Sequence, residues 1–359
     1  MSANHSLTQA PQYWEKKGLK ALALWPLSKV FGMASSIRRL LYDLGIIKSS
    51  ALPVPVVIVG NIRVGGTGKT PTVLALAKTL HAKGFRPGII SRGYKGSNQE
   101  ATEVTTSSLP SIVGDEPCYM AKQLQHLNTP IFVHPNRVSA GQQLLQQYPH
   151  VNVIISDDGL QHYKLRRWPA REGGHDIELV IRDARGEGNQ FLLPAGPLRE
   201  SVSRPRDFTF NLGLTESTGP YFQDAPSFDL EIKIGNIYQL KEPSRQISLT
   251  AISDLFDSGA PSKQQLLAAA GLGNPKKFFQ LLKDAGLQFN ELPLPDHFDF
   301  LSNPFRDRTE KVILITEKDA VKCMQLNDYK DDERIWVLPV TVDLPDDFIS
   351  QMVDILKRP

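Results

Sequence analysis

The sequence is poor in cysteine and carries almost no excess of charge of either sign. Its two cysteines, Cys118 and Cys323, stand far apart and show no metal-binding spacing such as C-x-x-C. This argues against a cysteine metal site and favours a reducing compartment. The 41 Lys and Arg residues against 38 Asp and Glu leave a formal net charge of +3. So small a charge gives no reason to expect a nucleic-acid partner.

Long uncharged hydrophobic runs are also missing. Lys20, Lys29 and Arg38 interrupt the apolar runs near the N-terminus, well short of the roughly 18 residues that a membrane-spanning helix requires. No small-residue cleavage site suggests a signal peptide. The chain of 359 residues is 41% hydrophobic and 22% charged, which is typical of a folded globular protein and long enough for two domains.

The first 48 residues nevertheless show a helical apolar pattern. Apolar residues recur at helical spacing at Leu27, Val30, Phe31, Ala34, Ile37, Leu41 and Leu44, which predicts an amphipathic helix. Pro26 should end or kink any helix that continues from Gly18. The segment could lie in a membrane interface, with aromatic anchors and headgroup-binding cations at Tyr13, Trp14, Trp25, Lys16, Lys17, Arg38 and Arg39. A helix packed on its own domain is an equally good interpretation.

The most informative stretch is the run from Gly60 to Thr70, which joins a predicted strand to a predicted helix. Glycines at 65, 66 and 68 leave space for backbone amides to converge on an anion. Lys69 supplies a positive charge for the β- and γ-phosphates, and the Thr70 hydroxyl supplies a ligand for Mg²⁺. The common pattern G-x-x-x-x-G-K-[ST] has glycine where this chain has Arg63, so we predict a variant phosphate loop. A glycine turn that merely closes a strand-helix unit is the alternative.

Downstream of this loop, short apolar runs alternate with helical stretches. Buried strands are predicted at 54–59, 87–91, 130–133, 151–156 and 177–181, with helices at 71–83, 117–125 and 139–147. Strands separated by crossover helices form a parallel sheet with helices on both faces. After a stretch at 217–227 rich in Gly, Pro, Ser and Thr, further strands are predicted at 266–270, 312–315 and 335–340. We therefore predict an amphipathic membrane-interface segment (1–48), a P-loop nucleotide-binding and catalytic α/β domain (49–225), and a smaller α/β domain that closes over the site (226–359).

Two acidic motifs stand where catalytic groups are expected. Asp157 and Asp158 follow the strand predicted at 151–156, where a P-loop enzyme keeps an acid that holds Mg²⁺ directly or through water. An ordinary Asx turn is the alternative. Asp115 precedes a helix, and N-capping alone explains it. As a carboxylate beside a phosphate site, it could instead accept a proton from an attacking hydroxyl.

Four further motifs are candidates for the site. Arg92 could meet an acidic group and Tyr94 could pack on a sugar, because both follow a strand at the presumed ligand edge. The run Leu193 to Glu200 is rigid, so that it could hold Arg199 towards phosphate and Glu200 towards a metal; a surface turn is the alternative. Asp296-His297 places a lone histidine in a polar turn, where a structural role is the usual one. Thr316-Glu317-Lys318-Asp319 has the spacing of a capping box.

Taken together and in order, these motifs resemble those of the tetraacyldisaccharide 4'-kinases, the lipid A 4'-kinase family. The resemblance extends from about Gly60 to Lys322. It rests on seven motifs in register: Gly65 to Pro71, Ser91 to Tyr94, Gly114 to Pro117, Asp157 to His162, Leu193 to Glu200, Asp296-His297 and Thr316 to Asp319.

The resemblance implies a reaction and a role for each motif. The γ-phosphate of ATP would pass to the 4'-hydroxyl of a membrane-embedded tetraacyldisaccharide 1-phosphate, at the cytosolic face of a bacterial inner membrane. ATP would be bound by Gly65, Gly66, Thr67, Gly68, Lys69, Thr70 and Arg199, and Mg²⁺ by Thr70, Gln161 and Glu200. Asp115 would be the base, supported by His297, with Arg92, Tyr94, Asp157 and Asp158 on the substrate side. An anionic membrane surface would bind the N-terminal helix, and no obligate protein partner is evident.

Two departures from the family pattern stand out. The family often continues Asp-His with a second His, where this chain has Phe298, and the segment Trp168 to His175 is an insertion that we expect to be an exposed loop. Two other functions remain open at this point. A P-loop switch or metal-delivery chaperone would predict a Cys/His cluster, which the sequence lacks. A kinase of a soluble sugar would leave the N-terminal helix without a purpose.

Overall fold

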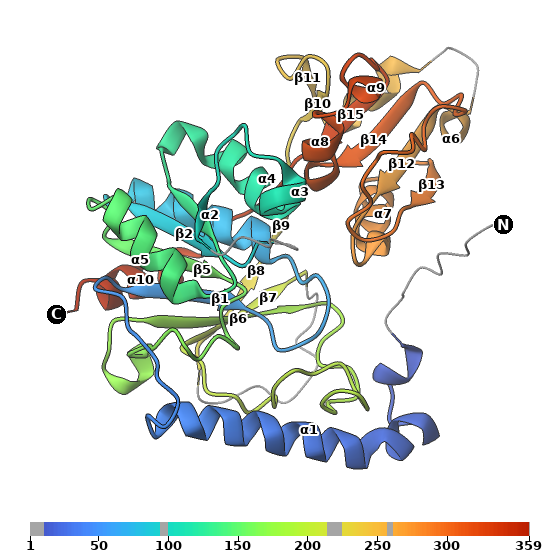
Figure 1. Ribbon diagram of the computed structural model, residues 1–359. Coiled ribbons are helices and arrows are strands. Elements are labelled where there is room, and N and C mark those ends of the chain that lie inside the picture. Colours follow the sequence, from blue (N-terminus) through green and yellow to red (C-terminus); the bar gives the residue numbers. More distant parts are fainter. Residues whose placement is uncertain (1–10, 94–99, 214–224, 257–260, 359) are drawn as a thin grey trace. The chain divides into compact units, whose positions relative to one another are not determined.

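The computed structural model describes residues 11–93, 100–213, 225–256 and 261–358. Tyr94 and most of the stretch at 217–227 lie outside the described residues. The chain folds into two compact units (Figure 1). The first unit comprises Ala10–Ile232 and Val342–Pro359, and the second contains Lys233–Thr341.

The first unit is built on an eight-stranded sheet in the order β3-β4-β2-β5-β1-β6-β7-β8. Its strands are β1 (Val56–Gly60), β2 (Pro87–Ser91), β3 (Thr102–Glu103), β4 (Ile131–Val133), β5 (Val153–Asp157), β6 (Ile177–Asp183), β7 (Phe208–Leu212) and β8 (Ser227–Leu230). Neighbouring strands are parallel except β3 and β4. Every residue of β1, β2 and β5 is buried, as expected for a parallel sheet covered on both faces. The predicted parallel α/β sheet is confirmed.

Crossover helices connect the parallel strands of this unit. Its helices are α2 (Lys69–Ala82), α3 (Pro110–Val113), α4 (Asp115–Leu124), α5 (Arg137–Gln147) and α10 (Asp346–Leu356), with short 3₁₀ turns η2 (Gln125–Leu127) and η3 (Ala170–Glu172). Val59 of β1 stands beside Asp157 of β5, and Ile90 of β2 beside Ser156. The carboxyl ends of these three strands therefore meet at one edge of the sheet, where ligands bind in such folds.

The second unit has a six-stranded sheet in the order β11-β10-β15-β14-β12-β13. Its elements are β10 (Ile237–Gln239), β11 (Gln246–Ile247), η4 (Leu249–Leu255), α6 (Ser262–Gln265), β12 (Leu266–Ala270), α7 (Pro275–Asp284), β13 (Asn290–Pro293), β14 (Val312–Thr316), α8 (Glu317–Cys323), α9 (Asn327–Lys330) and β15 (Ile335–Leu338). The Thr316 hydroxyl accepts the backbone N–H of Asp319 at 3.2 Å and caps α8. The N-cap of the predicted capping box is thus confirmed, while the Asp319 carboxylate accepts from the Gly271 N–H and the Thr316 hydroxyl.

The division into units differs from the expected domains at the C-terminal side. The chain passes between the units at Ile232/Lys233 and at Thr341/Val342, within β9 (Ile232–Ile234) and β16 (Val340–Val342), which form a two-stranded sheet. Helix α10 belongs to the first unit, although the sequence placed residues 342–359 in the second domain. Its Phe348 is fully buried, with its ring centroid 4.6 Å from that of Phe210 on β7.

The N-terminal segment forms a 3₁₀ turn, η1 (Gln12–Trp14), and one long helix, α1 (Leu19–Asp43), which lies along one side of the first unit (Figure 1). The helix continues through Pro26, where the sequence led us to expect an end or a kink. Ala21 and Ser28 are the buried residues of α1. In the described part of the chain, no helix is long and apolar enough to cross a membrane.

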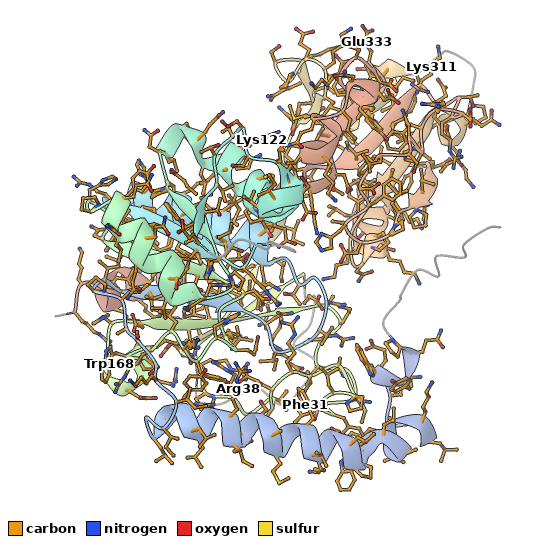
Figure 2. The ribbon with its side chains drawn as sticks, in the orientation of Figure 1. Phe31, Arg38, Lys122, Trp168, Lys311 and Glu333 are labelled. Carbon is orange, nitrogen blue, oxygen red and sulfur yellow. The ribbon has the colours of Figure 1, made fainter. Side chains whose placement is uncertain are left out.

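The outer face of α1 is apolar. A row of its side chains projects away from the rest of the unit (Figure 2). The large exposed apolar residues of this helix are Leu19, Leu22, Trp25, Leu27, Val30, Met33, Ile37 and Leu40; Met33, for example, is 60% exposed. An ordinary surface helix buries this face, so α1 is turned the opposite way, with small residues inwards.

Candidate active site

The phosphate loop lies between the end of β1 at Gly60 and the start of α2 at Lys69. Gly65 and Gly68 have φ angles of 108° and 85°, which side chains rarely tolerate. A Cβ atom on Gly68 would lie 2.1 Å from the Leu212 side chain. The glycines are therefore required by both conformation and space, as the motif predicts, and the first turn of α2 presents its backbone amides at the loop.

Lys69 faces two oxygen atoms across this loop. Its Nζ donates to Asn61 Oδ1 at 3.2 Å and lies 3.5 Å from Asp158 Oδ1. Arg199 Nη1 lies 3.6 Å from the same carboxylate oxygen. Burial alone would raise the pKa of Asp158, but Lys69 and Arg199 hold it below its usual value. Two cations suited to phosphate thus meet at one carboxylate.

Asp157 ends β5 and is buried. Ser91 Oγ, at the end of β2, donates to its Oδ2 at 3.0 Å, and Arg137 donates to its backbone carbonyl at 3.2 Å. Burial is the main reason that the pKa of Asp157 rises from 3.8 to about 6, and the carboxylate of Glu116 raises it further. This perturbed acid, at a strand end beside a phosphate loop, is typical of a functional group.

Two buried oxygens at this edge accept no hydrogen bond from the described residues. They are Asp157 Oδ1 and the hydroxyl of Thr67 in the phosphate loop. Unsatisfied buried polar atoms are rare in native proteins and call for an explanation. Carboxylate and hydroxyl oxygens next to Lys69 are the groups that Mg²⁺ with a triphosphate requires, so the residues present fit these ligands.

The structure brings together two of the three predicted metal ligands. Gln161 Nε2 donates to Glu200 Oε1 at 2.7 Å, while Thr70 lies in the first turn of α2. The Glu200 carboxylate also accepts from Tyr163 Oη at 3.0 Å and from Arg204 Nε at 2.7 Å. Burial, followed by the charge of Glu200, raises the pKa of Tyr163 to about 12, so Tyr163 remains a donor. Glu200 is thus held in one orientation.

Asp115 is the first residue of α4, and Gly114 is the N-cap. The prediction that Asp115 caps this helix is therefore wrong, because the cap position is displaced by one residue to a glycine with φ 98°. The Asp115 side chain is 4% exposed. A buried carboxylate in the first turn is stabilised by the helix dipole, and capping no longer accounts for it.

The remaining predicted residues are distributed over both units. Arg92 is exposed just beyond the end of β2. Burial lowers the pKa of Arg137 to about 10, and the charge of Arg92 lowers it further. Tyr94 lies outside the described residues. His297 belongs to the second unit, with φ 58° and its Nε2 3.8 Å from Asp296 Oδ2. Lys318 Nζ lies 3.5 Å from the other oxygen of Asp296.

A cavity of about 490 Å³ opens beside Arg199 and Glu200 in the first unit. Its walls come from α1, including Ser28, Met33 and Arg39, and from residues 190–192, 199–201 and 203–205. The cavity therefore joins the apolar-faced helix to the residues next to the phosphate loop.

Sequence reasoning missed a buried charge cluster under the site. Glu178 of β6 pairs with Arg167 at 2.8 Å, Arg171 at 2.9 Å and Arg204 at 2.9 Å. Burial alone would raise the pKa of Glu178, but these guanidinium groups, Arg204 first, lower it to about 2. Arg204 in turn holds Glu200. Nothing local in the sequence indicated that these charges are buried or that they meet.

The insertion Trp168 to His175 is only partly the exposed loop that we expected. The Trp168 ring is half-exposed at the edge of the first unit (Figure 2), and Arg166 stacks over it, 4.4 Å from the ring centroid. The same insertion contributes Arg171 to the Glu178 cluster. The ion pair between Arg171 and Glu178 therefore attaches the insertion to the first unit.

Comparison with known proteins gives concordant matches. A family model described as tetraacyldisaccharide-1-P 4'-kinase matches residues 20–357. Tetraacyldisaccharide 4'-kinases from Polynucleobacter asymbioticus and Herminiimonas arsenicoxydans are each 48% identical, over 98% and 96% of this chain and 96% and 94% of their own. The crystal structure of LpxK from Aquifex aeolicus in complex with ATP has 28% identity and a TM-score of 0.72, covering 94% of this chain and 99% of that one.

Proposed function

The chain belongs to the tetraacyldisaccharide 4'-kinase family, and we propose that it carries out that family's reaction at the strand ends of the first unit. The enzyme transfers the γ-phosphate of ATP to the 4'-hydroxyl of tetraacyldisaccharide 1-phosphate in lipid A biosynthesis. It uses ATP with Mg²⁺. We further propose the roles of individual residues, the contact with the membrane and the cellular location of the reaction.

The observation that carries the site proposal is the convergence of Lys69 and Arg199 on Asp158 beside a glycine phosphate loop. Both cations are suited to bind the β- and γ-phosphates, with the amides of residues 65–70 around them. Thr70, Gln161 and Glu200 are the proposed ligands of Mg²⁺, which neutralises charge on the transferring phosphoryl group when bound. Gln161 Nε2 already donates to Glu200, so the two side chains lie close enough to bind the same Mg²⁺ ion.

Asp115 is the proposed catalytic base. In the transfer, its carboxylate accepts the proton of the 4'-hydroxyl while that oxygen forms a bond to the γ-phosphorus, and the bond between the γ-phosphorus and the bridging oxygen breaks to release ADP. No phosphoenzyme is formed. Burial of Asp115 at the start of α4 holds the carboxylate in place, and positioning of this kind supplies most of the catalysis. His297 is proposed to support Asp115.

The substrate is proposed to approach from the α1 side. The cavity beside Arg199 and Glu200 shares a wall with α1, so that a sugar bound there would have its acyl chains beside the exposed apolar face. Arg92, Tyr94, Asp157 and Asp158 are the proposed substrate-facing residues. The apolar row on α1, flanked by exposed Lys29 and Arg38, fits an anionic bilayer surface. We place the enzyme at the cytosolic face of the bacterial inner membrane.

One assay tests the reaction and the site together. The purified protein is incubated with Mg·ATP and tetraacyldisaccharide 1-phosphate, and the lipid product is identified by mass. We expect one added phosphate and its loss in Asp115→Ala, while the variant still binds ATP. An Asp115→Ala protein that turns over at the wild-type rate would remove Asp115 from the mechanism. ATP hydrolysis without lipid phosphorylation would instead favour a switch-type NTPase.

A further inference from the structure

Arg63 occupies the place where the common phosphate-loop pattern has glycine, and its side chain is buried. Its Nη1 donates to the backbone carbonyls of Arg185 at 3.0 Å and Gly186 at 3.1 Å. Its Nη2 donates to the carboxylate of Glu15. The guanidinium therefore links the phosphate loop to two distant segments of the chain, one of which precedes α1.

Other residues of the phosphate loop also bond to residues 185–199 of the chain. Val64 N–H donates to the Pro197 carbonyl at 2.9 Å, and Arg199 N–H donates to the Ile62 carbonyl at 2.7 Å. Arg185 Nη2 donates to the Gly66 carbonyl at 2.9 Å and is itself paired with Asp183. The loop that binds phosphate is thus set by a frame formed by residues 183–199.

Residues 11–18, which we call the brace, are attached to this frame. Trp14 Nε1 donates to the Pro194 carbonyl at 3.1 Å, and Asn189 N–H donates to the Trp14 carbonyl at 2.7 Å. Asn189 Nδ2 also donates to the Tyr13 carbonyl at 3.0 Å. A Cβ atom on Gly188 would lie 2.4 Å from the Trp14 carbonyl oxygen. The close approach of the two backbones at Gly188 shows that the brace is fitted closely to the frame.

We propose that the brace is part of the nucleotide site, with Glu15 as a positioning residue that acts through Arg63. Glu15 supplies the counter-charge that a buried guanidinium in the phosphate loop requires. Because Glu15 of the brace contacts Arg63 of the phosphate loop, docking of the brace on the frame and nucleotide binding are thermodynamically linked. Each strengthens the other by the same factor. The brace also runs directly into α1. The inference rests on the proposed role of the phosphate loop in binding ATP.

The first test measures nucleotide affinity without lipid. Binding of a non-hydrolysable ATP analogue with Mg²⁺ is compared in the full-length wild type, Glu15→Gln, Arg63→Thr and the double variant, all in detergent solution. We expect Glu15→Gln to bind about 5- to 20-fold more weakly, within the usual range of coupling between sites, and to retain most of its kcat at saturating ATP. The double variant should be no weaker than Arg63→Thr, because Glu15 acts through Arg63. Additive losses would overturn the link.

Asp43→Asn is the matched control for this measurement. Asp43 ends α1 and pairs with Arg39 at 3.8 Å on the surface, so its substitution removes a carboxylate from the helix that follows the brace without touching the frame. Its nucleotide affinity should equal that of the wild type. If Glu15→Gln also binds as the wild type does, the brace proposal fails while the kinase assignment stands. If Lys69→Ala binds as tightly as the wild type, the proposed nucleotide site fails, and the brace with it.

The reciprocal effect gives a second readout. Lys16 and Lys17 are exposed beside Glu15 and offer trypsin a cleavage site within the brace. The nucleotide analogue should slow cleavage there in the wild type by the same factor, and protection should be lost in Glu15→Gln. A merely structural role for Glu15 would raise cleavage equally with and without nucleotide, which would contradict the linkage.

Discussion

Lys69 and Asp158 form an ion pair across the phosphate loop, with 3.5 Å between Nζ and Oδ1. The lysine that the family reaction needs for phosphate is therefore occupied by a carboxylate from the end of the neighbouring strand, and Arg199 shares the same oxygen at 3.6 Å. In the proposed site, an incoming triphosphate competes with Asp158 for both cations. We expect ATP to displace Asp158 from these pairs and so to free its carboxylate for the acceptor side of the site.

Replacing Asp158 with Asn should separate nucleotide affinity from turnover. The variant removes the competitor for Lys69 and Arg199, so we expect ATP to bind about two- to fivefold more tightly, which corresponds to one partly exposed ion pair. Turnover should fall, because the substrate-facing carboxylate is lost. Steady-state KM for ATP, direct nucleotide binding and kcat provide the comparison. Weaker ATP binding in Asp158→Asn would show that the carboxylate supports the nucleotide and does not compete with it.

Asp115→Asn should slow phosphoryl transfer but leave ATP binding unchanged. An amide of the same size cannot accept the proton of the 4'-hydroxyl, so kcat should fall roughly 10²- to 10⁴-fold, the usual contribution of a general base. The KM for ATP should stay near the wild-type value. Parallel measurement of lipid phosphorylation and analogue binding distinguishes this result from unfolding, and a rise in KM at unchanged kcat would assign Asp115 to binding.

The stability of the protein should report the titration of Asp157. Burial raises the pKa of this carboxyl to about 6, against 3.8 in the unfolded chain. A raised pKa stabilises the folded state below the unfolded value, and this contribution is lost as the pH rises from about 4 through 6. The difference in unfolding free energy between wild type and Asp157→Asn should shift by about 3 kcal/mol over that window. Urea titrations of both proteins without nucleotide at pH 4 to 7.5 test this, and a difference independent of pH would contradict it.

Glu178→Gln should be among the most destabilising single substitutions in the first unit. Among the described residues it removes the carboxylate that faces Arg167, Arg171 and Arg204 together. Arg171 and Arg204 keep Asp207 and Glu200 as partners, but the buried Arg167 loses its carboxylate, which costs roughly 3–5 kcal/mol. Denaturant unfolding measures the loss. The control is Glu172→Gln, whose exposed side chain lies 3.4 Å from Arg171 and should matter by less than about 1 kcal/mol. Equal effects in the two variants would mean that the cluster is not buried in solution.

The outer face of α1 should determine membrane binding. Met33→Ser with Ile37→Ser replaces two exposed apolar side chains, each worth about 1.5–3 kcal/mol when buried in an apolar phase. We expect at least tenfold weaker co-sedimentation with vesicles that contain anionic lipid, and little change in ATP binding. Leu301→Ser, at an exposed leucine of the second unit, is the control. If both proteins sediment like the wild type, α1 is not the membrane-binding element.

The sequence predicted best what depends on local pattern. The apolar runs gave β1, β2 and β5 to within about two residues, and the glycines with Lys69 predicted the phosphate loop, because both follow from backbone chemistry. The Asp115 cap failed by one position, since Gly114 takes the cap and local spacing alone did not separate the two. Pro26 was expected to end or kink the helix, yet α1 continues through it from Leu19 to Asp43.

What the sequence could not predict arises from tertiary contacts. Glu178 and Arg204 are far apart along the chain, and both belong to residue types that usually lie at the surface. Only the packing of β6 and the following loops brings them together as a buried ion pair. Arg63 was predicted to belong to a variant phosphate loop, but its partners Glu15 and Gly186 lie far from it in the sequence and could not be predicted. The sequence also did not predict that α10 belongs to the first unit, because the pattern of an amphipathic helix does not indicate which sheet the helix covers.

The position of α10 has a consequence for the order of synthesis. Its Phe348 fills the space between Phe208, Phe210 and Phe228, so β7 and β8 keep an open apolar surface until residue 356 has left the ribosome. The described part of the second unit lies between Lys233 and Thr341 and can fold before that moment. The nucleotide-binding unit, although translated first, is therefore completed last, and nascent chains that lack α10 should be the form that chaperones recognise.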